Sequence, residues 1–306
     1  MSQQLFVIAM RCGRLANRLI LFANFVAFAE EHRHRLSNVT FHSYFHSFET
    51  LRKDIYCRYP APLKKSRFDN LPGATGVIRV TRIFYHAVRT AARLNEKIRL
   101  FGRKALTLRE IPDREVTLLN DPVIVDKLST ARVIFVYGWR FRAPGLVRKH
   151  AEKIRAYFRP VEGIVQSVDE TVQQIRKQAD IIVGVHIRRG DYRSWMQGRY
   201  FFDISHYYAW MLEMAGLFPD RKVCFFISSD EPPSKNEFNG LTVKIAAGPA
   251  VNDLYTLSQC DFLIGPPSTF SQWASFYGNK PLLHLRKKDE RISLENFHVS
   301  FFENIP

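Results

Sequence analysis

A run of apolar residues over 181–185 is followed by four side chains that can bind anions or carry protons: His186, Arg188, Arg189 and Asp191. Apolar, β-branched runs of this kind are typical of buried strands in parallel sheets. The imidazole and the two guanidinium groups therefore stand at the carboxyl end of a strand, which is the edge where open α/β sheets bind ligands. Each planar guanidinium can hold phosphate oxygens through two hydrogen bonds, so the pair suits a diphosphate.

These four residues divide between the strand and the turn that follows it. Side chains alternate along a strand, so His186 and Arg188 share one face, while Arg189 and Asp191 lie in the turn at Gly190. Asp191 can hold an arginine ready for a phosphate through a charge-assisted ion pair. The alternative is an ordinary surface ion pair beside a histidine of the core.

A second predicted strand also ends in polar residues, with Asp230 shortly after Phe226 and Ile227. A carboxylate here can accept hydrogen bonds from the N1–H and 2-amino groups of guanine, a pair of donors that adenine lacks. The alternative is that Asp230 caps a turn before Pro232, a common position for aspartate.

A third group follows the predicted strand 262–265 and opens a helix: Ser268, Thr269, Ser271 and Gln272. Ser268 or Thr269 suits the N-cap. A helix N-terminus presents free N–H groups and partial positive charge, so it can bind a phosphate to which the hydroxyls would add donors. Capping without any ligand is the alternative.

A fourth group lies in a glycine turn before the first predicted helix and contains Gly13, Arg14 and Asn17. The turn matches neither GxxxxGK[ST] nor GxGxxG, so by itself it names no ligand.

All four groups lie at predicted strand-to-helix junctions. In the first half we predict strands at 5–10, 39–42 and 132–137, helices at 15–31 and 145–158, and a loop over 59–76. In the second half we predict helices at 161–178, 204–217, 252–260 and 268–277, and strands ending at 186 and covering 223–228, 241–245, 262–265 and 281–285. Strands that alternate with helices predict doubly wound parallel sheets.

The preferred domain boundary is at Arg159-Pro160, because proline disfavours helix in the residue before it. The sequence then divides into an N-terminal α/β domain, residues 1–160, and a C-terminal Rossmann-like domain, residues 161–306. Two such domains facing a central cleft are the simplest architecture for 306 residues.

The composition favours a folded protein in a reducing compartment. Hydrophobic residues make up 46% of the chain, and no apolar stretch reaches the roughly 20 residues of a membrane span. The first ten residues lack the features of a secretory signal. The four cysteines are far apart and form no CxxC pair, so a zinc site or disulfide framework is not expected. We therefore expect a cytoplasmic protein.

The formal charge of +16 suits nucleic acid, an anionic membrane surface or a phosphorylated small substrate as partner. Much of the excess falls within residues 79–114, where basic and apolar residues interleave at near-helical spacing. Such a helix can lie peripherally on the inner face of a membrane. The alternative is a surface helix that packs its apolar stripe on its own domain. Nucleic acid is not expected, because no nucleic-acid motif is present.

Four segments resemble motifs of the α1,2-, α1,6- and protein O-fucosyltransferases. GVHIRRGDY resembles their HxRRxD-type motif, and GRLANR resembles the opening motif of the α1,2-fucosyltransferases. FFISSDE and STFSQWASF are similar to the two later motifs. The resemblance implies a GT-B fold, GDP-fucose as donor, inversion at the anomeric carbon and no required metal or other cofactor.

The resemblance also implies roles for single residues. Arg188 would hold the β-phosphate, and His186 and Asp230 would contact guanosine. Ser271 and Gln272 would line the pyrophosphate site, and the loop over 13–17 would face the reaction centre.

The sequence departs from the family pattern at three positions. Ala16 and Arg18 replace the usual glycine and glutamine, and Met196 stands where some α1,6-fucosyltransferases carry a candidate base. Asp191 and Asp203 are candidates for the base by location only, and Asp191 is better suited to organise the arginines.

We therefore expect an inverting, metal-independent glycosyltransferase that transfers fucose from GDP-fucose to a glycan or glycolipid hydroxyl in polysaccharide synthesis. Arg188, Arg189 and the helix N-terminus would stabilise the departing diphosphate in place of a cation. The alternatives are a transferase with another nucleotide-sugar donor, a non-catalytic sugar-nucleotide-binding module and a nucleic-acid-binding protein.

Overall fold

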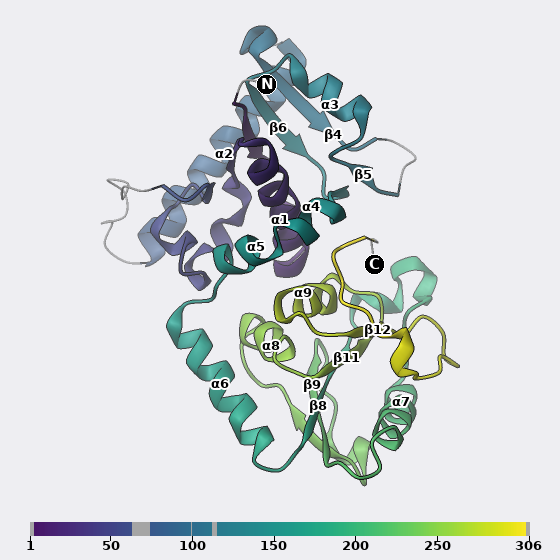
Figure 1. The fold of residues 1–306 in the computed structure, drawn as a ribbon. Helices are drawn as coiled ribbons and strands as arrows, with labels where there is room; N and C mark the ends of the chain where they lie inside the picture. The colour runs from purple at the N-terminus through teal and green to yellow at the C-terminus, as the bar shows by residue number, and fades with distance from the viewer. Residues whose placement is uncertain (1–2, 63–73, 99, 112–114, 304–306) are drawn as a thin grey trace. The chain divides into compact units, whose positions relative to one another are not determined.

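The computed structural model describes residues 3–62, 74–98, 100–111 and 115–303, which form two compact α/β units (Figure 1). The first unit holds the described residues up to Val161 together with Phe301 to Glu303, and the second holds Glu162–Ser300. Each unit contains a five-stranded sheet with mostly parallel pairing. The predicted pair of Rossmann-like α/β folds is therefore confirmed.

The first unit has the sheet order β3-β2-β1-β6-β4, in which only β3 is antiparallel to its neighbour. Helix α1 is buried along most of its length because its residues from Leu19 to Ala29 are apolar on every face apart from Asn24. The elements in chain order are β1 (Leu5–Ile8), α1 (Leu15–His32), β2 (Arg35–Ser37), β3 (Arg58–Tyr59), α2 (Ala74–Ile98), β4 (Ala105–Arg109), β5 (Thr117–Leu118), α3 (Pro122–Ser129), β6 (Val133–Tyr137), β7 (Phe141–Arg142), α4 (Pro144–Lys149) and α5 (Ala151–Tyr157).

The prediction of a strand at 39–42 was wrong. Val39–Ser43 forms a 3-10 helix, because the Asn38 side chain accepts a hydrogen bond from the Thr40 N–H and caps the turn. The strand of this region is β2, which lies just before that cap.

Two further boundaries differ from expectation. The basic segment 79–114 is not one helix, because α2 ends at Ile98. The chain then turns at Gly102, which has a φ of +63°, and forms β4. The helix predicted over 145–158 is two helices that meet at His150. Of the predicted loop over 59–76, residues 63–73 lie outside the described residues, as does Arg114 of the basic segment.

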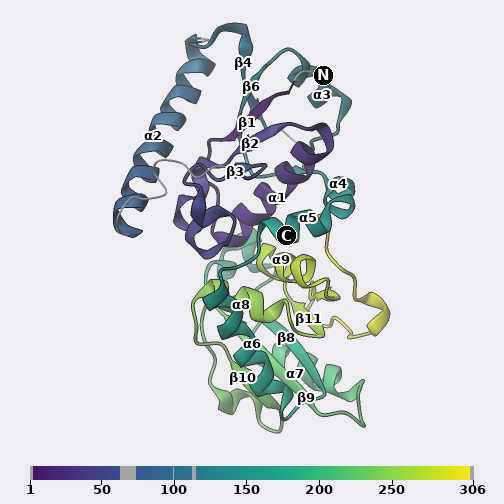
Figure 2. The ribbon, with the colours of Figure 1, turned by 60° about the vertical axis from the view of Figure 1, so that its left-hand side comes forward.

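Helix α2 lies beside the first sheet (Figure 2), and one stripe of its side chains packs against that sheet. Tyr85 and Ala92 are buried against residues of β1 and β6, whereas Ile83 is 69% exposed. The helix therefore packs on its own domain, as the predicted alternative has it, while contact of its exposed face with a membrane stays a prediction. Among the residues described, no helix is long and apolar enough to span a membrane.

The second unit has the order β10-β9-β8-β11-β12, with every neighbouring pair parallel. Helix α7 packs on the face of β8 that carries Val183, Val185 and Ile187. Strands β9 and β11 flank β8 on opposite sides, so the strand order reverses there. The elements are α6 (Glu162–Arg176), β8 (Ile181–Ile187), α7 (Ile204–Gly216), β9 (Val223–Ser229), β10 (Thr242–Ile245), α8 (Ala250–Leu257), β11 (Phe262–Gly265), α9 (Thr269–Gly278) and β12 (Leu282–His284).

Candidate functional site

The carboxyl ends of β8, β9 and β11 bring three of the four predicted groups together in the second unit. His186 lies opposite Ser228 in the register of β8 with β9. On the other side, Gly265 passes so close that an added Cβ would lie 2.6 Å from the His186 carbonyl oxygen. Glycine at this position therefore allows the two strand ends to approach each other.

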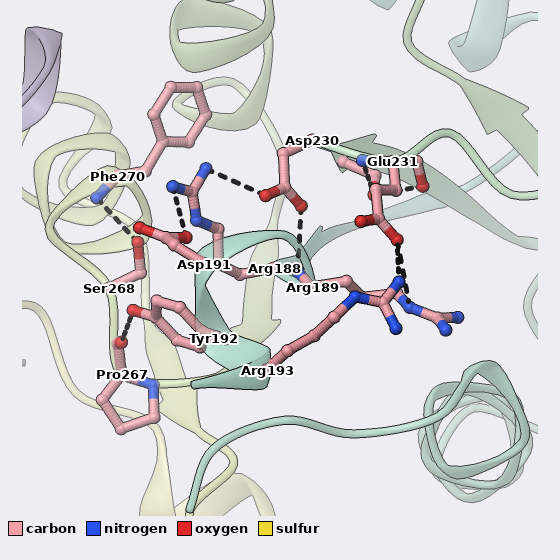
Figure 3. A network of polar contacts seen from close by, with 11 residues as sticks. Arg188, Arg189, Asp191, Tyr192, Arg193, Asp230, Glu231, Pro267, Ser268 and Phe270 are labelled. Atoms are coloured by element: carbon pink, nitrogen blue, oxygen red, sulfur yellow. Dashed lines mark hydrogen bonds and ion pairs between the residues drawn. The ribbon is translucent and has the colours of Figure 1, made fainter. Parts of the chain in front are cut away.

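Arg188 is held between two carboxylates (Figure 3). Its Nη2 lies 2.7 Å from Oδ1 of Asp191, and its Nη1 lies 3.2 Å from Oδ2 of Asp230. The side chains of Arg188 and Asp230 are each only 16% exposed. Two ion pairs thus fix a partly buried guanidinium at the sheet edge, which pre-organises its remaining donors for an anion.

Asp230 also fixes the turn after β8. Its Oδ1 accepts a hydrogen bond of 2.9 Å from the Arg189 backbone N–H. A Cβ at Gly190 would lie 2.7 Å from Oδ2, so the turn packs directly on the carboxylate. Both oxygens of Asp230 are consequently engaged by the loop that carries the arginines.

Two further cations lie beside this pair. Arg189 Nε is 3.6 Å and Arg193 Nη2 is 2.6 Å from Oε2 of Glu231, and both guanidinium groups lie over the Phe201 ring. Arg193 was not among the predicted site residues. The sequence signal for Arg193 is its position in HIRRGDYR, four residues after Arg189 and at the end of the short 3-10 helix Asp191–Arg193.

His186 is buried and stacks on Phe270 with ring centroids 5.0 Å apart. Burial lowers the pKa of the imidazole to about 4, and the charge of Arg188 acts in the same direction against the opposing effects of Asp230 and the Ser228 backbone. The ring is therefore neutral at pH 7. Neither ring nitrogen makes a hydrogen bond of normal geometry within the described residues, although both are buried.

The residues at the start of α9 are occupied largely with capping. Ser268 Oγ accepts a hydrogen bond of 3.2 Å from the Phe270 N–H, and Ser271 Oγ donates to the Ser268 carbonyl at 3.0 Å. Ser271 and Gln272 are buried, while Thr269 is half-buried. The N-cap prediction for Ser268 is confirmed, and the end of the helix stands at the same sheet edge as Arg188.

Tyr192 joins the arginine turn to this helix start. Its hydroxyl donates to the Pro267 carbonyl at 2.5 Å (Figure 3). The loop after β8 and the loop after β11 are thereby held together by a single buried side chain.

Asp253 is a carboxylate that the sequence reasoning missed. It lies in the first turn of α8, where Ser228 Oγ donates to its Oδ2 at 3.4 Å. Burial raises the pKa of this carboxyl to about 6, against the effect of the Ser228 hydrogen bond. No local pattern marks it, because its burial depends on the contact between α8 and β9.

The fourth predicted group lies in the first unit. Gly13 has a φ of +52°, and an added Cβ would meet the Asn17 side chain at 2.6 Å. Arg14 stands at the N-cap of α1 without a capping side chain. The buried Arg18 donates twice to the Gly13 carbonyl, so the arginine that replaces the family's glutamine holds this loop.

The two candidate bases differ in their surroundings. Asp191 is tied to Arg188, whereas Asp203 is exposed at the N-cap of α7. Within the described residues, no cluster of three His, Cys, Asp or Glu side chains could hold a metal ion.

Comparison with known proteins identifies one family and a number of solved structures with a similar fold. Residues 139–299, more than half of the chain, match the model of glycosyl transferase family 11. Arabidopsis thaliana FUT1, a point mutant in complex with GDP, has 14% identity, covers 100% of this chain and 77% of its own, and gives a TM-score of 0.53. Fucosyltransferase NodZ from Bradyrhizobium has 17% identity, with 93% and 96% covered and a TM-score of 0.52. No curated protein matches the sequence.

Proposed function

Because this chain belongs to glycosyl transferase family 11 and is a fucosyltransferase-like enzyme of GT-B type, we propose that it transfers fucose from GDP-fucose to a glycan hydroxyl. The observation that carries the proposal is the fixed guanidinium of Arg188 between Asp191 and Asp230. The α-1,6-fucosyltransferase NodZ has been co-crystallised with GDP, which supports a guanosine diphosphate as the nucleotide.

The reaction breaks the bond between the anomeric carbon and the β-phosphate oxygen and forms a bond from the acceptor oxygen to that carbon. Negative charge develops on GDP as it leaves. Arg188 and Arg189, with the N-terminus of α9, supply positive charge at one sheet edge, which lowers the energy of that transition state without a metal ion. Attack from the opposite side inverts the anomeric configuration, and the acceptor proton passes to a base.

Asp191 is assigned to positioning Arg188, since its carboxylate is 2.7 Å from that guanidinium. The neutral His186 is assigned to the nucleoside, because it lies at the carboxyl end of β8 and neither ring nitrogen has a hydrogen-bond partner of normal geometry among the described residues. Ser271 and Gln272 are assigned to the wall of the pyrophosphate site, together with Thr269 and the capped end of α9.

Two carboxylates near the end of β9 can recognise guanine. Asp230 already accepts from Arg188 and Arg189, whereas Asp253 accepts a single long hydrogen bond from Ser228 among the described residues. We assign the guanine edge to Asp253 and the organisation of the arginine loop to Asp230. Binding of two guanine N–H donors would stabilise the charged form of Asp253.

The experiment is donor-dependent product formation. The protein is incubated with GDP-fucose, GDP-mannose or UDP-sugars and a panel of glycans, with and without EDTA, and GDP release and product linkage are measured. We expect transfer from GDP-fucose alone, unaffected by EDTA, with inversion of the fucose anomer. Thermal stabilisation by UDP compounds but not by GDP would overturn the proposal.

A further inference from the structure

The first unit contains a cavity of about 560 Å³, which is within the range of about 300–1,000 Å³ typical of small-molecule sites. It lies at the carboxyl edge of the first sheet. Arg11 follows β1, and Tyr137 and Arg109 end the neighbouring strands β6 and β4 in register with each other. Strand order reverses between β1 and β6, so the cavity occupies the switch point of this sheet, as the arginine site does in the second unit.

Helix α2 supplies the opposite wall. Tyr85, Arg89 and Arg93 line the cavity at successive intervals of four residues and so share one helix face. The Tyr137 hydroxyl donates to the Arg89 carbonyl at 3.0 Å, which ties this stretch of the helix to the strand end. The wall of the cavity is therefore anchored on a strand and a helix.

The charge of the cavity is strongly positive. Of its four arginines, Arg109 is paired with Glu96 through two contacts of 2.6 Å and lies over the Tyr137 ring. Arg11, Arg89 and Arg93 form no ion pair within the part of the chain that the structure describes. Arg89 and Arg93 are like charges four residues apart on one helix face, and such pairs destabilise a helix, so an anion bound between them would offset their repulsion.

We propose that this arginine-lined cavity binds a phosphate group of the acceptor, so that the enzyme acts on a phosphorylated glycan. The inference rests on the proposed function, in which the second unit binds the donor. Three uncompensated guanidinium groups suit the oxygens and double charge of a phosphate. Tyr85 and Tyr137 supply aromatic wall area on which a sugar ring can pack.

Binding of the acceptor alone is the first test, because it does not require transfer. Calorimetry compares galactose 1-phosphate, galacturonic acid and methyl galactoside as probes. We expect the phosphate to bind about tenfold or more tightly than the methyl glycoside, which corresponds to about 1.4 kcal/mol. Equal binding of the neutral probe, or tighter binding of the carboxylate, would overturn the proposal.

Two double variants on one helix separate the cavity from general surface charge. Arg89→Gln with Arg93→Gln removes two cavity charges, while Arg82→Gln with Lys97→Gln removes two exposed charges of α2 that do not line the cavity. We expect the first to lose the preference for the phosphate and the second to retain it. Equal loss in both would show a nonspecific charge effect and would overturn the site.

Two further measurements separate failure of the phosphate site from failure of the proposed function and from binding to a membrane surface. GDP affinity, measured by thermal shift, is expected to be unchanged in the Arg89/Arg93 variant; a wild-type protein that does not bind GDP would instead refute the proposed function. Binding to anionic phosphatidylserine vesicles tests the lipid alternative. If the Arg89/Arg93 variant lost vesicle binding but kept its preference for the sugar phosphate, the arginines would belong to a membrane surface and the proposal would fail.

Discussion

Arg188 and Asp230 connect the loops of two neighbouring strands, with Nη1 3.2 Å from Oδ2 at the carboxyl edge of the second sheet. The contact does more than pair two charges. The same carboxylate accepts the Arg189 backbone N–H at 2.9 Å, so it fixes both the side chain of one arginine and the backbone of the next. Removal of the aspartate would therefore disturb both cations.

Replacement of Arg188 by alanine is expected to reduce turnover about 100-fold or more and to weaken GDP binding. It removes a charge proposed to act on the leaving group, for which single electrostatic groups contribute about 10²–10³ in rate. The measurement is kcat with GDP-fucose and the Kd for GDP. Unchanged turnover in a folded Arg188→Ala protein would contradict the assignment.

Asp191→Asn is the matched comparison for Arg188→Ala. It keeps the size of the side chain but removes the charge that holds Arg188 at 2.7 Å. We expect a smaller loss of about tenfold in kcat, because the pair with Asp230 remains. A loss as large as that of Arg188→Ala would instead indicate that Asp191 is itself the base.

Gly265→Ala is expected to destabilise the protein by about 1–3 kcal/mol, the usual cost of overpacking. The new Cβ would lie 2.6 Å from the His186 carbonyl oxygen, so β8 and β11 would have to separate. Gly163→Ala in α6 is the control, since no heavy atom lies near its Cβ position and alanine favours helix. Urea unfolding measures both, and equal stability of the two variants would contradict the close approach.

The second sheet could be predicted well because its strands are continuous apolar runs. Val223–Ser229 and Phe262–Gly265 have that pattern, and both were placed within one residue. In the first unit, Val39 and Thr40 favoured a strand by residue type, but the cap from Asn38 gave a 3-10 turn. Local side-chain hydrogen bonds can override propensity over such short stretches.

The site could be predicted to the extent that its contacts are local in sequence. The pair of Arg188 with Asp191 spans three residues and follows from the turn. The bond from Arg189 to Asp230 requires the register of β8 with β9, and the burial of Asp253 requires the packing of α8. Residue spacing alone contains neither the register nor the packing.

Histidine burial predicts a loss of stability in acid. Burial lowers the pKa of His186 to about 4 and of His284 to about 3, whereas the unfolded value is near 6.5. Between pH 6.5 and 4 the unfolded chain binds more protons, so the free energy of unfolding falls as pH falls. For His186 this fall in the free energy of unfolding amounts to about 3 kcal/mol between pH 6.5 and pH 4, and above pH 6.5 there is none.

The variant His186→Asn isolates that contribution. Urea unfolding is measured from pH 4.5 to 8. Below pH 6.5 the free energy of unfolding is expected to change less steeply with pH than in the wild type, because one of the buried imidazoles is gone. Parallel curves for the two proteins would mean that His186 is accessible to protons in the native state.

Asp253 has the opposite pH dependence. Burial raises its pKa from 3.8 to about 6, so between these values the native state binds more protons than the unfolded chain and stability falls as pH rises. Asp253→Asn removes this effect. At pH 7 we expect the variant to be more stable by about 1–2 kcal/mol, less than the full shift implies because the carboxyl is partly solvated.

The same variant tests nucleotide recognition. An amide side chain offers only one acceptor oxygen and adds donors, so Asp253→Asn is expected to weaken GDP binding about tenfold or more while leaving the affinity for ADP unchanged. Asp230→Asn is the comparison: it is expected to weaken GDP and ADP alike, because it loosens the arginines that hold the diphosphate. Loss of base selectivity in the Asp230 variant but not in the Asp253 variant would reverse the two assignments.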